Sequence, residues 1–174
     1  MINKEKTPKS IIKIVVPILI IAVILGIFIL KGNQKEPIAD TTGEFALEVT
    51  AIDLEQLKSY GLPMVIDFGA DSCEPCKAMA PVLQELNKEM QGKVIVKFVD
   101  VWKNPKAVAD FPVQVIPTQF FFDKDGNPFV PKDADAMQME LYTTKDTNKH
   151  VYTAHRGGMT EEQLKDVLKE MGVE

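Results

Sequence analysis

Three short, almost continuously apolar segments constrain the fold of this chain most strongly: PMVIDFGA (63–70), KVIVKFVDV (93–101) and TQFFFD (118–123). Apolar runs of this length, bounded by turn residues, are typical of buried strands. Between the first two, apolar residues recur at helical spacing from Met79 to Met90, which predicts a helix with one buried face. The alternation of strands and helices predicts a small α/β domain with a mixed central sheet flanked by helices.

Turn and capping residues predict further elements on both sides of these segments. An Asp or a Thr followed three residues later by a Gln marks two helix starts, and an Asn-Pro pair marks a third. The additional predicted elements are a strand at 45–49, helices at 53–61, 104–110 and 160–171, and a strand at 150–156.

Residues 128–149 are more than a hairpin loop needs. Met137, Met139 and Leu141 alternate with polar neighbours, and this period of two favours an extra strand at the edge of the sheet. A binding flap is the alternative interpretation. The segment is therefore predicted as an insertion before the last strand.

A second constraint lies near the N-terminus, where residues 14–30 contain no charged or hydrogen-bonding side chain. At about 1.5 Å per residue, a helix of this length spans most of a bilayer core, so we expect a single-pass transmembrane anchor in the cell membrane; a cleaved signal peptide is the alternative. Four lysines and one glutamate precede the span, which predicts a cytoplasmic N-terminus and an extracytoplasmic C-terminal domain. The expected organisation is a basic N-terminus at 1–13, the anchor at 14–30, a linker at 31–44 and the α/β domain at 45–174.

The charge of the chain is unevenly distributed. The net charge is −5 over 174 residues, but residues 1–37 hold six lysines and two glutamates, which leaves 14 basic and 23 acidic residues, a net charge of −9, for the remainder. An acidic domain is a poor match for nucleic acid or anionic lipid. We therefore expect no nucleic-acid partner, and contact with the membrane through the N-terminal helix.

The chain has two cysteines, Cys73 and Cys76, separated by two residues. A purely structural disulfide of this spacing would close a small ring and remove little entropy from the unfolded chain. A zinc site would need about four ligands, and His150 and His155 lack the spacing of a zinc finger, so we expect no metal site.

Thiol chemistry accounts for the pair better. Cys73 falls where the strand at 63–70 ends and the next helix begins, so its thiolate would lie near exposed backbone N–H groups and the positive end of the helix dipole. Cys76 lies one turn further along, where it would be more buried and suited to attack a mixed disulfide formed by Cys73. Pro75 near the first turn costs no helical hydrogen bond. We therefore expect a redox-active disulfide between the two cysteines and no other cofactor.

Three separate motifs resemble those of the thioredoxin family. VIDFGADSCEPCKAMAP (65–81) is similar to its active-site segment, in which a strand ending in Asp-Phe leads into W-C-x-P-C-K and a proline-containing helix. VQVIPT (113–118) resembles the loop with a cis-proline after isoleucine, and RGGMTEEQL (156–164) resembles the glycine-containing turn before the last helix. The resemblance covers about residues 45–174, apart from 128–149, and implies a thioredoxin-like fold.

The resemblance also implies catalytic roles. Cys73 would be the attacking thiol, Cys76 the resolving thiol, and Asp67 a buried carboxylate that shuttles the proton as Cys76 deprotonates. Burial is expected to raise the pKa of Asp67 into a useful range. The remaining residues of the implied active-site loop are Ser72, Glu74, Pro75 and Lys77.

A substrate-binding wall is implied beside the cysteines. Ile116, Pro117 and Thr118 would line it, so that a substrate backbone pairs there like an added strand. Proline has no N–H, which leaves room for the substrate and keeps metals off the thiols. Gly157 would let the substrate chain approach closely.

Several positions depart from the family pattern. Gly69 and Ser72 stand where cytosolic thioredoxins usually have tryptophans. Glu74 replaces the usual glycine, and a carboxylate next to Cys73 disfavours its thiolate and moves the pair modestly towards the reducing end. The family's lysine near the buried aspartate has no secure counterpart, because an ungapped comparison places Phe98 there and Lys97 one residue away.

We expect a membrane-anchored oxidoreductase that reduces disulfides of extracytoplasmic proteins, with an integral-membrane thiol transporter as its electron donor. Glu74 and the isoleucine before Pro117 favour reduction. The alternatives are an extracytoplasmic dithiol oxidase, a copper(I) metallochaperone that uses Met137 and Met139 with the thiols, and a purely structural ectodomain. The residues expected to be solvated on their strand are His150, His155 and Arg156, and Trp102 is expected to contribute packing.

Overall fold

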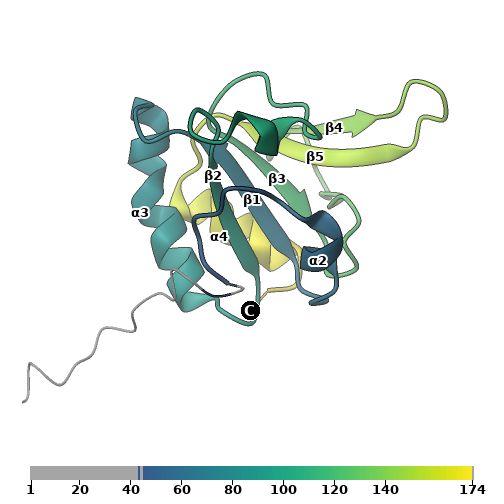
Figure 1. Ribbon diagram of the computed structural model, residues 1–174. Coiled ribbons are helices and arrows are strands. Elements are labelled where there is room, and N and C mark those ends of the chain that lie inside the picture. The colour runs from purple at the N-terminus through teal and green to yellow at the C-terminus, as the bar shows by residue number, and fades with distance from the viewer. Residues whose placement is uncertain (1–42, 44, 174) are drawn as a thin grey trace, which may run out of the picture. The chain divides into compact units, whose positions relative to one another are not determined.

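Up to the third strand, the domain alternates helices with strands, as the apolar segments predict; the third, fourth and fifth strands then follow one another before the last helix (Figure 1). The computed structural model describes residues 43 and 45–173. In chain order the elements are α2 (Leu54–Lys58), β1 (Met64–Gly69), α3 (Glu74–Glu89), β2 (Ile95–Asp100), the 3-10 helix η1 (Pro105–Val108), β3 (Thr118–Phe122), β4 (Met139–Thr143), β5 (His150–Arg156) and α4 (Glu161–Glu170).

The five strands form one mixed sheet in the order β2-β1-β3-β5-β4. β1 and β2 are parallel, and the other three pairs are antiparallel. The extra edge strand predicted within 128–149 is therefore confirmed as β4. Met139 on β4 is buried, but Leu141 is 44% exposed, because the β4–β5 hairpin extends past the body of the domain (Figure 1).

The two faces of the sheet are covered by different helices. On one face, Val65 and Phe121 pack in a cluster with residues of α3 and α4. On the other face, Ile66 and Phe120 pack with Leu57 of α2. Because side chains alternate along a strand, each residue of β1 faces one of these two layers. The thioredoxin-like α/β arrangement expected from the sequence is present in the described residues.

The predicted strand at 45–49 is reduced to one bridge, between Glu48 and Phe98. The two preceding carbonyl groups bond to side chains instead of to β2: the Phe45 oxygen accepts from Asn87 Nδ2 at 2.9 Å, and the Ala46 oxygen accepts from Lys97 Nζ at 2.7 Å. Two carbonyl groups of the predicted strand are therefore satisfied by side chains.

The helix predicted at 104–110 is also shorter than expected. It is the single 3-10 turn η1, with Asn104 at its N-cap. The final helix agrees with the prediction, since Thr160 and Gln163 form a full capping box at the start of α4.

The predicted anchor at 14–30 and almost all of the predicted linker lie outside the described residues. Within the described part of the chain, no helix combines the length and the apolar character needed to cross a bilayer.

Candidate active site

The two cysteines lie at the junction of β1 and α3, as predicted. Cys73 is the N-cap residue of α3 and is partly exposed, while Cys76 lies inside the first turn and is 4% exposed. Both are free thiols in this structure. Pro75 occupies the first turn, where its missing N–H breaks no helical bond. The site therefore combines one accessible sulfur with one covered sulfur.

The surroundings of the two sulfurs differ. Cys73 Sγ makes no capping hydrogen bond to α3, and it lies 3.8 Å from the carbonyl oxygen of Ile116. Burial, followed by a hydrogen bond with Cys73, raises the pKa of Cys76 to about 12. Cys76 is thus held as a thiol until a neighbouring group takes its proton.

A suitable proton acceptor lies on the same face of the sheet. Asp67 on β1 is buried, and burial raises the pKa of its carboxyl to about 7, although a hydrogen bond from Gln119 acts in the opposite direction. A Cβ placed on Gly69 would lie 3.3 Å from Asp67 Oδ2 and 3.3 Å from Cys76 Sγ, so these two atoms are at most twice that distance apart. The structure therefore brings together the three residues expected to carry the chemistry.

The position of Phe98 accounts for glycine at position 69. The same Cβ on Gly69 would lie 2.8 Å from Phe98 Cε2, which is closer than side chains tolerate. Phe98 is the register partner of Asp67 on β2, whereas Lys97 pairs with Ile66 and so projects to the opposite face. Lys97 Nζ donates to the Ala46 carbonyl. Neither residue places a cation beside Asp67.

The expected wall beside Cys73 is formed by the loop before β3. The Ile116–Pro117 bond is cis, and the Pro117 carbonyl accepts from Gly157 N at 2.8 Å. Gly157 has a φ of 103°, which glycine adopts without strain. Thr118 is buried and donates through Oγ1 to the Val115 carbonyl at 2.8 Å, so its side chain shapes the loop from inside.

The acidic and basic residues of the active-site loop are mostly paired. Glu74 and Lys77 are both exposed and form an ion pair at 2.8 Å across the first turn of α3. This pairing partly offsets the negative charge that Glu74 places next to Cys73. Ser72 is exposed and has no bulky side chain to cover the accessible sulfur.

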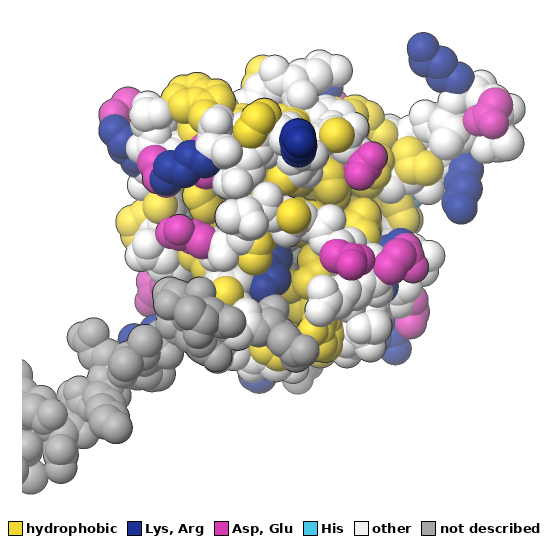
Figure 2. Space-filling model, in the orientation of Figure 1, with side chains coloured by type: hydrophobic (Ala, Val, Ile, Leu, Met, Phe, Trp, Pro, Cys, Tyr) yellow, Lys and Arg dark blue, Asp and Glu magenta, His cyan; other side chains and the backbone are white. Residues whose placement is uncertain are grey.

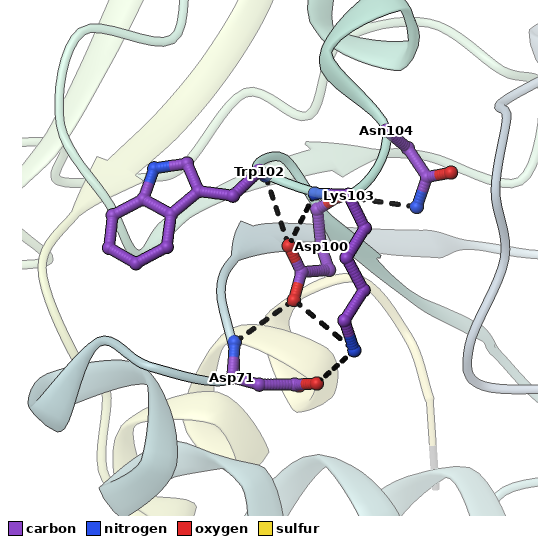
Figure 3. Close-up of polar contacts among 5 residues, drawn as sticks. All are labelled: Asp71, Asp100, Trp102, Lys103 and Asn104. Carbon is purple, nitrogen blue, oxygen red and sulfur yellow. Dashed lines mark hydrogen bonds and ion pairs between the residues drawn. The ribbon is translucent and has the colours of Figure 1, made fainter.

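Asp100 at the end of β2 ties the active-site loop to the following turn (Figure 3). Its Oδ2 accepts from the backbone N–H of Asp71, and its Oδ1 accepts from the backbone N–H groups of Trp102 and Lys103, each at 3.0–3.1 Å. Burial acts to raise the pKa of Asp100, but these three bonds prevail and lower it. The Lys103 ammonium adds an ion pair with Asp71. One carboxylate thus fixes both loops beside Cys73.

Trp102 does not pack as expected. Its side chain is 62% exposed and extends away from the Asp71–Lys103 pair (Figure 3). Val115, in the loop before Pro117, is 48% exposed. The two loops that adjoin the active site from β2 and β3 each present an apolar side chain to solvent, which is an arrangement suited to a polypeptide partner.

Two further polar residues were missed by the sequence interpretation. Gln119 on β3 donates from Nε2 to Asp67 Oδ1 at 2.7 Å, and its Oε1 lies 3.2 Å from His155 Nδ1. The prediction that His155 is solvated is wrong, because its side chain is 4% exposed. His150 is partly buried and contacts Thr153, and Arg156 is exposed. A glutamine inside the apolar run TQFFFD was the available signal.

The methionines offered as copper(I) ligands do not form a site with the thiols. Met139 is buried in the cluster beneath α3 and α4, and Met137 packs against the same cluster. Within the part of the chain that the structure describes, no three His, Cys, Asp or Glu side chains are grouped as a metal site would require.

Comparison with known proteins identifies relatives of this chain. The thioredoxin family model matches residues 48–170. Thioredoxins of Staphylococcus aureus strains MW2 and N315 are 40% identical over 93 residues, which is 50% of this chain and 88% of theirs. Among solved structures, chloroplastic thioredoxin z is 24% identical with a TM-score of 0.46, covering 72% of this chain and 96% of that one. Malassezia sympodialis thioredoxin is 19% identical with a TM-score of 0.47, covering 73% and 90%.

The raised pKa of Asp67 predicts that its carboxyl destabilises the domain at neutral and alkaline pH. The folded domain keeps this proton up to about pH 7, whereas an unshifted aspartate has a pKa of 3.8, so stability falls as pH rises between these values. Asp67→Asn removes the titration. Its free energy of unfolding should exceed that of the wild type at pH 8 by on the order of 4 kcal/mol, with little difference at pH 4.

Urea unfolding at pH 4, 6 and 8 measures this difference. Asp166→Asn, on the exposed surface of α4, is the matched control and should change little. A difference between Asp67→Asn and wild type that is the same at all three pH values would contradict the assignment.

Proposed function

Because the chain belongs to the thioredoxin family and is therefore a thiol–disulfide oxidoreductase, we propose that it reduces disulfides of extracytoplasmic proteins through Cys73 and Cys76. The observation that carries the proposal is the pairing of a partly exposed sulfur at the N-cap of α3 with a buried sulfur one turn deeper. An accessible thiol can attack a protein disulfide, and a covered thiol can resolve the product without meeting other substrates.

The proposed exchange has two steps. Cys73, as a thiolate, attacks one sulfur of the substrate disulfide; a Cys73–substrate bond forms, and the other substrate sulfur leaves as a thiolate that takes a proton from solvent. Cys76 then loses its proton and attacks Cys73 Sγ, so that a Cys73–Cys76 disulfide forms and the second substrate sulfur is released. Two electrons pass from the dithiol to the substrate. The internal disulfide is the redox group, and no other cofactor is needed.

Asp67 is the proposed acceptor of the Cys76 proton. A carboxyl whose pKa is about 7 is present in both protonation states near neutral pH, so it can take up a proton and release it again. Asp67 Oδ2 and Cys76 Sγ would both contact a Cβ at Gly69, at 3.3 Å each, so the two groups are neighbours, and transfer through one bridging water is proposed.

Substrate is proposed to bind along the loop that contains Ile116. The Ile116 carbonyl points towards Cys73 Sγ, and Pro117 offers no competing N–H, so an extended peptide can pair with this loop. Trp102 and Val115, exposed on the two loops next to the active site, are proposed to contact apolar side chains next to the substrate cysteine. On the face seen in Figure 2, Lys and Arg side chains are interspersed with Asp and Glu, which suits a protein partner better than a polyanion.

Reduction is the proposed direction. The Glu74 carboxylate next to Cys73 and the isoleucine before Pro117 support it, although the Lys77 ion pair weakens the effect of Glu74. The proposed setting follows from the segment at 14–30: a single-pass anchor holds the domain outside the cell membrane, and an integral-membrane thiol protein returns electrons to the Cys73–Cys76 disulfide.

The exchange predicts distinct behaviour for the two cysteine variants. Cys76→Ser should form a stable mixed disulfide with its substrate, because no thiol remains to resolve it, while Cys73→Ser should trap nothing. The wild-type dithiol should reduce insulin, and each single variant should lose more than about 99% of multiple-turnover activity, since exchange needs both sulfurs.

Direction is measured by equilibration against glutathione. A potential near that of thioredoxins, about −270 mV, is expected, and a value near the −120 mV of strong oxidants would identify an oxidase instead. Failure of the excess dithiol form to reduce insulin would overturn the enzyme proposal.

Trp102 is the single tryptophan of the chain, so its fluorescence reports on the proposed docking surface. When a peptide is trapped on Cys73 of the Cys76→Ser variant, the emission should shift to shorter wavelength as the ring is covered. Trp102→Ala should raise KM for a protein substrate severalfold with little change in kcat, as expected for loss of an aromatic contact of about 0.5–1.5 kcal/mol. Val130→Ala is the control, because Val130 is 66% exposed but follows β3 at the opposite end of the sheet. Unchanged emission on trapping would exclude Trp102 from the contact.

The membrane setting has its own test. Protease added to intact cells should remove the 45–174 domain, while a cytoplasmic control protein survives. Protection of the domain until the membrane is disrupted would place it on the other side and would leave the thiol chemistry unaffected.

A further inference from the structure

A row of buried polar side chains crosses the sheet beside the cysteines. Asp67 on β1 is the register partner of Gln119 on β3, and Gln119 is the register partner of His155 on β5. Directly paired residues of adjacent strands point to the same face of a sheet, so all three lie beneath α3 and α4. Each is almost fully buried.

Hydrogen bonds connect the row from end to end. Gln119 Nε2 donates to Asp67 Oδ1 at 2.7 Å, and Gln119 Oε1 lies 3.2 Å from His155 Nδ1. In this amide orientation the oxygen faces His155, and because an amide oxygen can only accept, the bond requires the tautomer with the hydrogen on Nδ1. Gln119 Nε2 also lies 3.4 Å from Met79 Sδ on α3. In the reversed amide, the oxygen would face the Asp67 carboxylate and the Met79 sulfur, two acceptors, so these two groups select the orientation that donates to Asp67, and His155 bonds to the amide oxygen.

The titratable groups that face Asp67 are few. From α3 these are Cys76 and, at its N-cap, Cys73; from β5 it is His155, two strands away. β2 presents the uncharged ring of Phe98, and Lys97 projects to the other face. Burial lowers the pKa of His155, with a backbone hydrogen bond at Gly157 acting against it, so the ring is neutral at physiological pH. The hydrogen bond that the Asp67 carboxylate accepts from Gln119 therefore comes from a neutral amide.

We infer that Gln119 is a positioning residue for thiol exchange: its amide nitrogen holds the Asp67 carboxyl in place beside Cys76, and His155 holds the amide. This inference rests on the proposed role of Asp67 as the acceptor of the Cys76 proton. A donor that bonds to a carboxylate favours the charged form, so Gln119 keeps Asp67 able to accept a proton at neutral pH despite its burial.

Gln119→Met tests the inference in the full-length protein, because methionine fills a similar volume and has no N–H. The rate of release from the Cys73 mixed disulfide is measured from pH 5 to 9. The midpoint of its rise with pH should move up by about one pH unit, which lowers the rate about fivefold at pH 7 and leaves it nearly unchanged at pH 9. Gln91→Met, the same change on the exposed surface, should match the wild type.

His155 supplies a second pair of variants. His155→Leu removes the bond to the amide oxygen and should shift the midpoint in the same direction by a smaller amount. His155→Asn should restore it, because its side-chain N–H occupies much the same place as Nδ1–H. If Gln119→Met does not fold, this pair decides the question by itself.

Direct titration separates this inference from the proposed function. The carboxyl carbon of Asp67 is followed by NMR and assigned by its loss in Asp67→Asn. If the wild type reduces no disulfide but Gln119→Met moves this titration to higher pH, the function proposal fails and the link between Gln119 and Asp67 stands. If the titration and the rate midpoint are both unchanged, or if the rate falls equally at every pH, Gln119 serves packing alone and the inference is overturned.

Discussion

Burial of the Asp67 carboxyl beneath α3 is the constraint on which the site depends. A carboxyl group removed from water is costly unless it is neutral or hydrogen-bonded, and this one is both protonated up to about pH 7 and bonded to Gln119. The same helix that covers it also carries Cys76, so the cover and the reacting thiol belong to one rigid element. Moving α3 would expose the carboxyl and separate it from the sulfur at once.

Backbone hydrogen bonds fix the approach to the accessible sulfur. The two oxygens of Asp100 hold the N–H groups of Asp71 and Trp102, which joins the loop before Cys73 to the turn after β2. On the other side, the bond from Gly157 N to the Pro117 carbonyl joins the end of β5 to the loop before β3. Functional residues on loops are positioned precisely when rigid elements hold the loops in place. Here the Asp100 carboxylate and one backbone hydrogen bond attach the loops to the strands beside them.

Much of this arrangement could be read from the sequence, and the failures have identifiable causes. Continuous apolar runs predicted β1, β2 and β3, because strands covered on both faces need no polar face. The prediction of a full strand at 45–49 was wrong. The first two carbonyl groups of this segment bond to the side chains of Asn87 and Lys97, which are distant in sequence.

The prediction that His155 is solvated was wrong for another reason. Side chains alternate along a strand, so either His155 or Arg156 must point inwards. The pairing of β5 with β3, which places His155 opposite Gln119, decides that it is His155. Trp102 was assigned to packing on its residue type, and its exposure follows from the turn that Asp100 fixes, which places the ring outside the sheet. For His155, the deciding contact joins strands that are far apart in the sequence.

The departures from the family pattern around Asp67 depend on one another. The ring of Phe98 occupies the space that a side chain at Gly69 would need, so the ring in this position favours glycine at 69. An ungapped comparison places the same ring where the family has a lysine, and at this register position β2 presents no cation to Asp67. Gln119, from the strand on the other side of β1, supplies the hydrogen bond instead. A neutral amide stabilises a carboxylate less than a cation does, so the proton affinity of Asp67 in this chain is set mainly by burial and adjusted by one hydrogen bond.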